Sequence, residues 1–297
     1  QELSESLRAE LGPEFGVLTT RRYVIATNAN RNYAVWCGKL FERLQTAYFG
    51  YWKRDRLDLH EPRLPLCAII FADPAQYATY ATADAGPAVA GTQGYYSIRT
   101  NRIILTDLTH DASGPARSDA EIERRLEARI ANLTTIVHEA THQIAFNSGL
   151  HTRYADNPMW VTEGMAMYFE APDLRSSTGW RTIGRVHPGR LQQSRDYASQ
   201  RRQPGSLATL IASEDRFRDP ATIADAYAES WALTYFLIRE YRDEYAAYLK
   251  QLSGKRRLIW DTPETRVQEF EAAFGGNLAA LEEEFLKFMA RLRGAPR

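Results

Sequence analysis

Apolar residues in the N-terminal third of the chain follow two different spacings, which predict strands and helices in alternation. Short apolar runs bounded by proline or polar residues predict strands at residues 22–27, 64–72, 91–98 and 101–106. Between positions 29 and 52, apolar residues recur at helical spacing, and Pro74 is placed to begin a short helix. This third of the chain is therefore expected to be α+β.

From Ser118 onward the apolar spacing becomes that of helices. Ser118 and Glu121 form an S-x-x-E pair, in which each side chain can cap the other residue's backbone amide. The apolar stripe that follows predicts one long helix, bent along its length. A second helix is predicted from Asn157 and Pro158, an N-cap and first-turn pair, to about residue 170.

The last part of the chain is predicted to be mostly helical after an irregular segment. Residues 171–206 mix Gly, Pro, Ser and Arg with little periodicity, so they are expected to be mainly loop. Helical segments are predicted near residues 207–212, 221–241 and 266–292.

Composition narrows the class of protein. With 297 residues and 44% apolar content, the chain can bury a large core and fits a globular protein. Its 37 basic and 37 acidic residues balance, so no net field favours nucleic acid or an anionic membrane as a partner. The longest apolar stretches are far shorter than the roughly 20 residues of a membrane-spanning helix, and no membrane insertion is expected.

A metal-binding pattern lies inside the long predicted helix. His138-Glu139-Ala140-Thr141-His142 is an H-E-x-x-H motif, and residues four apart on a helix lie one above the other on the same face. Both imidazoles can therefore reach one cation, and they point roughly 150° away from the apolar stripe at about 100° per residue. The alternative is two histidines on a solvated face.

A catalytic zinc ion commonly has three protein ligands and one water, so the motif needs a third ligand. Glu163 is the candidate, because it lies on the next predicted helix and two consecutive helices joined by a short loop can pack antiparallel. Gly164 beside it allows a close approach of backbones. A plain first-turn glutamate, favoured by the helix dipole, would explain the position of Glu163 but not its pairing with the motif.

The sequence resembles a known family at these residues. HEATH followed by WVTEGMAMYFE resembles the gluzincin metallopeptidases, whose third ligand is a glutamate downstream of the second histidine. The later runs AYAESWALTYFLI and FEAAFGGNLAALEEEF are similar to a poorly characterised bacterial branch of these enzymes. The resemblance implies a zincin-like α+β fold. Residues 18–170 would form a lobe with the sheet and the zinc-binding helices, and residues 171–297 a mostly helical lobe completing the cleft.

The resemblance also implies a reaction, the hydrolysis of a peptide bond. Glu139 would take a proton from a zinc-bound water and return it to the leaving amine. Tyr227 is the candidate for stabilising the oxyanion, although it could equally be a packing residue. Tyr95 and Tyr96 could line the cleft edge where an extended peptide adds as a strand, with plain sheet residues as the alternative.

The pattern departs from the family in two places. Where gluzincin aminopeptidases carry Gly-x-Met-Glu-Asn, this chain has residues 91–96, GTQGYY, so aminopeptidase specificity is not supported. Met167 occupies the position of an aspartate that orients a metal-binding histidine in the thermolysin-like branch, which leaves Glu170 or Asp225 as candidates for that role. His187, in a loop before proline, is left outside the site.

The sequence thus predicts a zinc metallopeptidase acting on a peptide or protein. The alternatives are a noncatalytic binding protein that retains the fold and a zinc hydrolase of other substrates. Glu139 favours an enzyme, because a structural zinc site needs no base.

Two cysteines bear on the cellular compartment in which the protein works. Cys37 and Cys67 are either buried free thiols or one disulfide between the first long helix and the buried strand, and we predict the disulfide. Together with a first residue, Gln1, that suits a removed export signal, it predicts a secreted or periplasmic protein.

Overall fold

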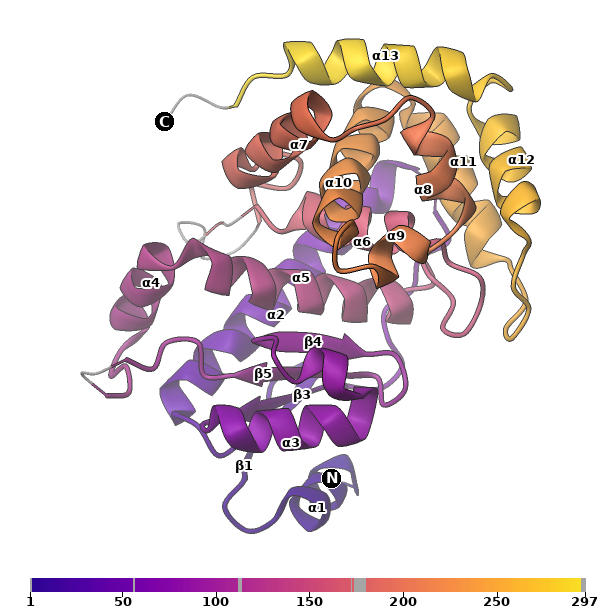
Figure 1. Cartoon of the computed structure of the whole chain (residues 1–297). Coiled ribbons are helices and arrows are strands. Elements are labelled where there is room, and N and C mark those ends of the chain that lie inside the picture. Colours follow the sequence, from indigo (N-terminus) through magenta and orange to yellow (C-terminus); the bar gives the residue numbers. More distant parts are fainter. Residues whose placement is uncertain (1, 56, 112–113, 172, 174–179, 295–297) are drawn as a thin grey trace. The chain divides into compact units, whose positions relative to one another are not determined.

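The computed structural model describes residues 2–55, 57–111, 114–171, 173 and 180–294 (Figure 1). The described residues form two compact units. The first lies within residues 1–51, 60–147 and 172–181, and the second within residues 52–59, 148–171 and 182–297. In this division, residues 148–171 group with the C-terminal helices rather than with the sheet.

The first unit contains a mixed five-stranded sheet, so the α+β class is confirmed. The strands are β1 (Gly16–Thr19), β2 (Tyr23–Thr27), β3 (Leu66–Phe71), β4 (Gly94–Ser97) and β5 (Arg102–Thr106). Their order is β1-β2-β3-β5-β4, in which β2, β3 and β5 run parallel while β1 and β4 are antiparallel edge strands. The four predicted strands are present, and β1 was not predicted because only Leu18 in it is buried.

Two helices cover one face of the sheet, α1 (Glu2–Leu11) and α3 (Pro74–Ala85). Their side chains Leu7, Tyr77 and Ala81 pack in one buried cluster with residues such as Val24 and Cys67 from the strands. Asp73 caps the start of α3 by accepting a hydrogen bond from the Ala75 amide at 2.9 Å. The helix predicted to begin at Pro74 is thus confirmed.

The opposite face of the sheet packs on α2 (Arg31–Trp52), the helix predicted for residues 29–52. The rings of Tyr23 and Phe41 lie 5.1 Å apart, and a Cβ atom added to Gly38 would lie 3.2 Å from Cδ1 of Ile25. Tyr23 and Ile25 alternate along β2 with Val24, which faces α1 and α3. The absence of a side chain at Gly38 therefore lets α2 approach the strand closely.

The predicted disulfide is wrong, because Cys37 and Cys67 are both free, buried thiols. Cys67 points into the cluster on the α1 and α3 side of the sheet. Cys37 lies on α2, which packs on the other face. Side chains on opposite faces of a strand cannot meet. The location outside the cytoplasm, which leaned on this bridge, stays a prediction.

The predicted single long helix is two helices, α4 (Asp119–Ala128) and α5 (Ile130–Asn147). Ser118 caps α4 as predicted, with the Glu121 amide donating to its hydroxyl at 3.2 Å, whereas the Glu121 side chain accepts from the amide of Arg117. Between the helices, Arg129 has a non-helical backbone with φ −133° and ψ 65°. The buried Asn132 side chain donates to the Leu108 carbonyl and helps to fix the new helix direction.

The second unit is helical. Its helices are α6 (Met159–Phe169), α7 (Pro188–Gln200), α8 (Ser206–Ala212), α9 (Asp215–Arg218), α10 (Ile223–Glu240), α11 (Arg242–Ser253), α12 (Pro263–Ala273) and α13 (Leu278–Arg291). A short 3-10 turn, Lys53–Asp55, also belongs to it, while Pro87–Val89 forms one in the first unit. No helix among the described residues is long and apolar enough to cross a membrane.

Two predictions for this unit need correction. Residues 188–200 form α7 instead of loop, because Pro188 occupies the first turn and the side chain of His187 caps it, accepting from the Arg190 amide. The segment predicted near residues 266–292 is split into α12 and α13 at Gly275 and Gly276, whose φ values of 97° and 76° end a helix. The six residues 174–179 of the predicted loop lie outside the described part of the chain.

Helix α6 is held by α10 at a point where the two backbones nearly touch. A Cβ atom added to Gly164 would lie 2.7 Å from the backbone oxygen of Ser230 and would overlap Oγ1 of Thr234. Only glycine permits this approach. The packing places α6 in the second unit and fixes the rotation of the helix that carries Glu163.

Candidate metal centre

Helix α5 presents both histidines of the motif on one face. Nε2 of His138 and Nε2 of His142 lie 3.0 Å apart, and the two rings are nearly perpendicular, with centroids separated by 4.7 Å. The side chain of His142 is buried, whereas His138 is half-buried. One turn of helix therefore brings two imidazole nitrogens to one point, as the spacing predicted.

The edge strand β4 holds Glu139. The Tyr96 amide donates a hydrogen bond to Oε2 of Glu139 at 2.7 Å. Backbone groups point alternately to the two sides of a strand. The carbonyls of Gln93 and Ser97 face the β5 side, where they accept hydrogen bonds from the amides of Thr106 and Asn101. The Tyr96 amide, at a position of the other parity, therefore points away from β5. The carboxylate of the proposed base is thus oriented by the outer side of the sheet.

The ring of Tyr96 lies against the same face of α5. It stacks on the imidazole of His142 with centroids 6.5 Å apart and on the ring of Phe146 at 5.6 Å. Its hydroxyl donates to Oδ1 of Asn101 at 2.8 Å. Tyr95 points to the other face of the sheet, where its hydroxyl donates to Asp84. Tyr96 therefore contacts the motif, whereas Tyr95 packs on the opposite face of the sheet.

Polar side chains fasten α5 to the sheet. The fully buried Gln143 donates through Nε2 to the carbonyl of Cys67 at 2.8 Å and to that of Asn101 at 2.9 Å. Asn147, one turn later, exchanges hydrogen bonds with the amide side chain of Asn101. Asn101 has a left-handed backbone, φ 59°, which asparagine tolerates better than most residues. These bonds fix the depth and rotation of the histidine-bearing helix.

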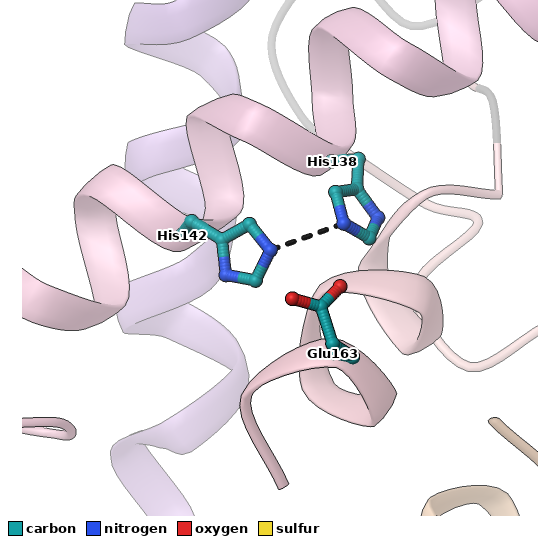
Figure 2. Close-up of side chains that lie close together, drawn as sticks. All are labelled: His138, His142 and Glu163. Carbon is teal, nitrogen blue, oxygen red and sulfur yellow. Dashed lines mark hydrogen bonds between the residues drawn. The ribbon is translucent and has the colours of Figure 1, made fainter. Parts of the chain in front are cut away.

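The third expected ligand, Glu163, lies on α6. Among the described residues, His138, His142 and Glu163 form a group that could hold a metal ion, since one ligand atom from each lies within 4.8 Å of the others. Figure 2 shows the Glu163 carboxylate directed toward the two imidazoles. Two imidazoles and one carboxylate are a donor set found at catalytic zinc sites.

The other candidates have identifiable contacts. Tyr227 is half-buried on α10, and its ring packs edge-on against Phe217 at 5.6 Å, so its role as an oxyanion donor stays a prediction. Glu170 is fully buried and ion-paired with Arg190, and Asp225 is ion-paired with Arg201. These pairs give both acids a structural role within the second unit.

His187 lies outside the metal group. Its Nδ1 accepts a hydrogen bond from the Arg190 amide at 3.3 Å at the start of α7. Burial lowers the pKa of His187, which favours the neutral imidazole that can accept this bond. A capping role explains this histidine.

The fold and the site together define an α+β protein with an H-E-x-x-H helix against the antiparallel edge of a mixed sheet. Residues 132–258 match a family described as a protein of unknown function, DUF1570. The matched segment is less than half of the chain, and it contains His138, Glu139, His142 and Glu163. Comparison with curated proteins gave no match.

Proposed function

We propose that the protein is a zinc-dependent metallopeptidase of the gluzincin type, with His138, His142 and Glu163 as metal ligands and Glu139 as base. The observation that carries the proposal is the convergence of the two imidazoles and one carboxylate, with the glutamate of the H-E-x-x-H motif beside them. The sequence resemblance to gluzincins supports the same assignment.

The architecture of the first unit agrees with a zincin-like fold. A mixed sheet with one antiparallel edge strand, β4, packs beside the helix that carries the motif. The hydrogen bonds of Gln143 hold that helix at a defined height over the sheet. Precise placement of ligands by a rigid scaffold is what a catalytic metal site needs.

The spacing of the histidine nitrogens suits zinc. Tetrahedral coordination with Zn–N bonds of about 2.0–2.1 Å places two ligand nitrogens about 3.3 Å apart. The observed separation of the two Nε2 atoms is 3.0 Å, so little adjustment is needed. Imidazole and carboxylate ligands also match the borderline character of Zn²⁺.

Glu139 has the position of a general base. Bound zinc would supply a Lewis acid that polarises the substrate carbonyl and lowers the pKa of water from 15.7 to about 7. The Glu139 carboxylate, held by the Tyr96 amide, would accept the proton of the attacking water and later deliver it to the leaving amine. Tyr227 remains our candidate for stabilising the oxyanion.

A peptide is the substrate class that the edge strand favours. Because Tyr96 turns its amide outward, an extended peptide could add to β4 through main-chain hydrogen bonds. The same amide binds Glu139 in the free protein. A peptide carbonyl that took this amide would release the carboxylate toward the water it must deprotonate.

The test is metal content followed by activity. Purified protein should contain about one zinc per chain, and a peptide-library digest should show cleavage that a chelator abolishes. His142→Ala should lose the zinc, because removing one of three ligands opens the site. His110→Ala is the matched control, since His110 is exposed and outside the metal group. Tightly bound zinc in His142→Ala would contradict the ligand assignment, and a zinc-loaded protein that cleaves no peptide would contradict the peptidase.

A further inference from the structure

Residues 256–260 form an exposed turn between α11 and α12 whose sequence is RRLIW, here called the RRLIW turn. Leu258, Ile259 and Trp260 are 66%, 53% and 61% exposed. Exposed large apolar residues are usually scattered singly over a protein surface, and the other such residues in the described part of the chain are separated from one another in the sequence. Three in succession indicate a contact surface.

The backbone of this turn is strained and fixed. Leu258 has φ 63° and Tyr154, on a neighbouring loop of the same unit, has φ 64°, a region that such side chains rarely adopt. The Leu258 amide donates to the Tyr154 carbonyl at 2.6 Å. Strained residues persist only where surrounding contacts hold them, and they gather at functional sites.

Further contacts hold the base of the turn. Thr152 donates to the Ser253 carbonyl at 2.8 Å, which ties the two loops together a second time. The Lys255 ammonium pairs with Asp261 and with Glu269. The apolar side chains are therefore presented to solvent by a rigid support.

Two positively charged side chains without an ion pair among the described residues lie beside the apolar residues. Arg256 and Arg257 are both exposed, and neither has an ion pair within the described residues. Lys255 uses its charge internally, and no acidic residue lies between it and Asp261. Two unpaired guanidinium groups thus directly precede the three apolar side chains.

We propose that the RRLIW turn binds the surface of an anionic lipid bilayer. Tryptophan prefers the interface between headgroups and acyl chains, and neighbouring arginines gain from the negative potential of anionic lipids. Apolar insertion combined with basic residues is the usual basis for peripheral binding. The two guanidinium groups complement the negative charge of such a lipid surface.

The experiment measures binding of the full chain to sedimented vesicles of phosphatidylcholine with or without phosphatidylglycerol. We expect binding to the anionic vesicles alone. Arg256→Gln/Arg257→Gln should weaken it about thirty-fold, at roughly 1 kcal/mol for each arginine near the surface. Ile259→Ser/Trp260→Ser should abolish it. Leu64→Ser is the matched control, because Leu64 is 78% exposed but lies elsewhere.

A second measurement does not depend on the folding of the double variants. Lipids brominated in their acyl chains should quench the fluorescence of the wild-type protein, and Trp260→Phe should remove that quenching. Absence of vesicle binding, or equal binding by wild type and the Ile259→Ser/Trp260→Ser variant, would overturn the proposal. Self-association lost in the same variant, without vesicle binding, would assign the turn to a protein contact instead. The test uses no peptidase activity and stands apart from the proposed function.

Discussion

Each unit has a glutamate on a helix, and the two glutamates differ in the groups that contact them. On α10, Glu229 is 1% exposed and lies between two arginines, with Nε of Arg202 and Nη1 of Arg216 each 2.7 Å from one of its oxygens. Ser206 donates a further bond to the same carboxylate. On α5, the half-buried Glu139 accepts a bond from the neutral amide of Tyr96.

The difference separates a structural carboxylate from the one for which we propose a chemical role. Two guanidinium groups and the Ser206 hydroxyl fix the position of Glu229, so this carboxylate joins α10 to the segments that carry Arg202 and Arg216. The Tyr96 amide orients Glu139, and the base that we propose at this position would accept a proton there. Two acids of the same residue type thus have contacts that suit different roles.

The largest expected effect is on turnover at Glu139. Glu139→Gln keeps the shape of the side chain and its hydrogen bond to the Tyr96 amide but cannot accept a proton. We expect the rate of peptide hydrolysis to fall about 10²–10⁴-fold with zinc content unchanged. Steady-state kinetics with metal analysis of the same sample is the measurement. Full activity in this variant would move the chemistry to another residue.

Glu229 should affect stability instead. Glu229→Ala leaves Arg202 and Arg216 without their buried partner, which is expected to cost about 3–5 kcal/mol of unfolding free energy. Denaturant titration measures this loss. Glu283→Ala, which removes an exposed acid paired with Lys287, should change stability by less than about 0.5 kcal/mol. Similar losses for the two variants would show that the buried pairs are not structural.

Alkaline stability should depend on the thiol of Cys67. Burial raises its pKa to about 11, whereas an unfolded cysteine titrates near 8.5. The folded chain therefore keeps the thiol proton after the unfolded chain has lost it, so this contribution is complete below pH ~8.5 and is lost as pH rises toward 11. Over that window wild type should lose up to about 3 kcal/mol more unfolding free energy than Cys67→Ala. Parallel curves for the two proteins would contradict burial of a free thiol.

The smallest effect is expected at Tyr96. Tyr96→Phe keeps the amide that holds Glu139 and the ring that stacks on His142, and removes the hydroxyl that donates to Asn101. Thermal unfolding should report a loss of about 1 kcal/mol. Zinc content and turnover should stay near wild type. A large loss of activity would mean that the hydroxyl itself takes part in the reaction.

The sequence was sufficient for elements with a strong local signal. The strands β2 and β3 are continuous apolar runs, and the start of α3 is fixed by Pro74. Helix α7 was not predicted, because only Leu191, Ser194 and Tyr197 are buried in it. One of these residues is polar and the other two are far apart, so no apolar stripe is visible in the sequence. The break at Arg129 is accompanied by a hydrogen bond from Asn132 to the carbonyl of Leu108, and the local apolar spacing does not reveal this bond.

The histidines of the candidate site could be predicted because their relation is local, whereas α7 has only a weak local pattern. His138 and His142 are related by one helical turn, so their convergence needs no tertiary information. The contact between Glu139 and β4 uses a backbone amide, and every residue except proline has one. The cysteines show the reverse case, since which face of the sheet each thiol occupies depends on how the strands and α2 pack.

The parallel pairing at the centre of the sheet has a consequence for how the chain acquires its structure. Pairing of β2 with β3 closes a loop of residues 28–65, and pairing of β3 with β5 closes a loop of residues 72–101. Loop closure over such separations is entropically slow, whereas neighbouring helices such as α10 and α11 meet through short connections. Helical segments should therefore be in place while the sheet is still assembling. During that interval β3, which is apolar along its whole length, is exposed to association with other chains. We expect chaperones to bind this segment before the sheet has formed.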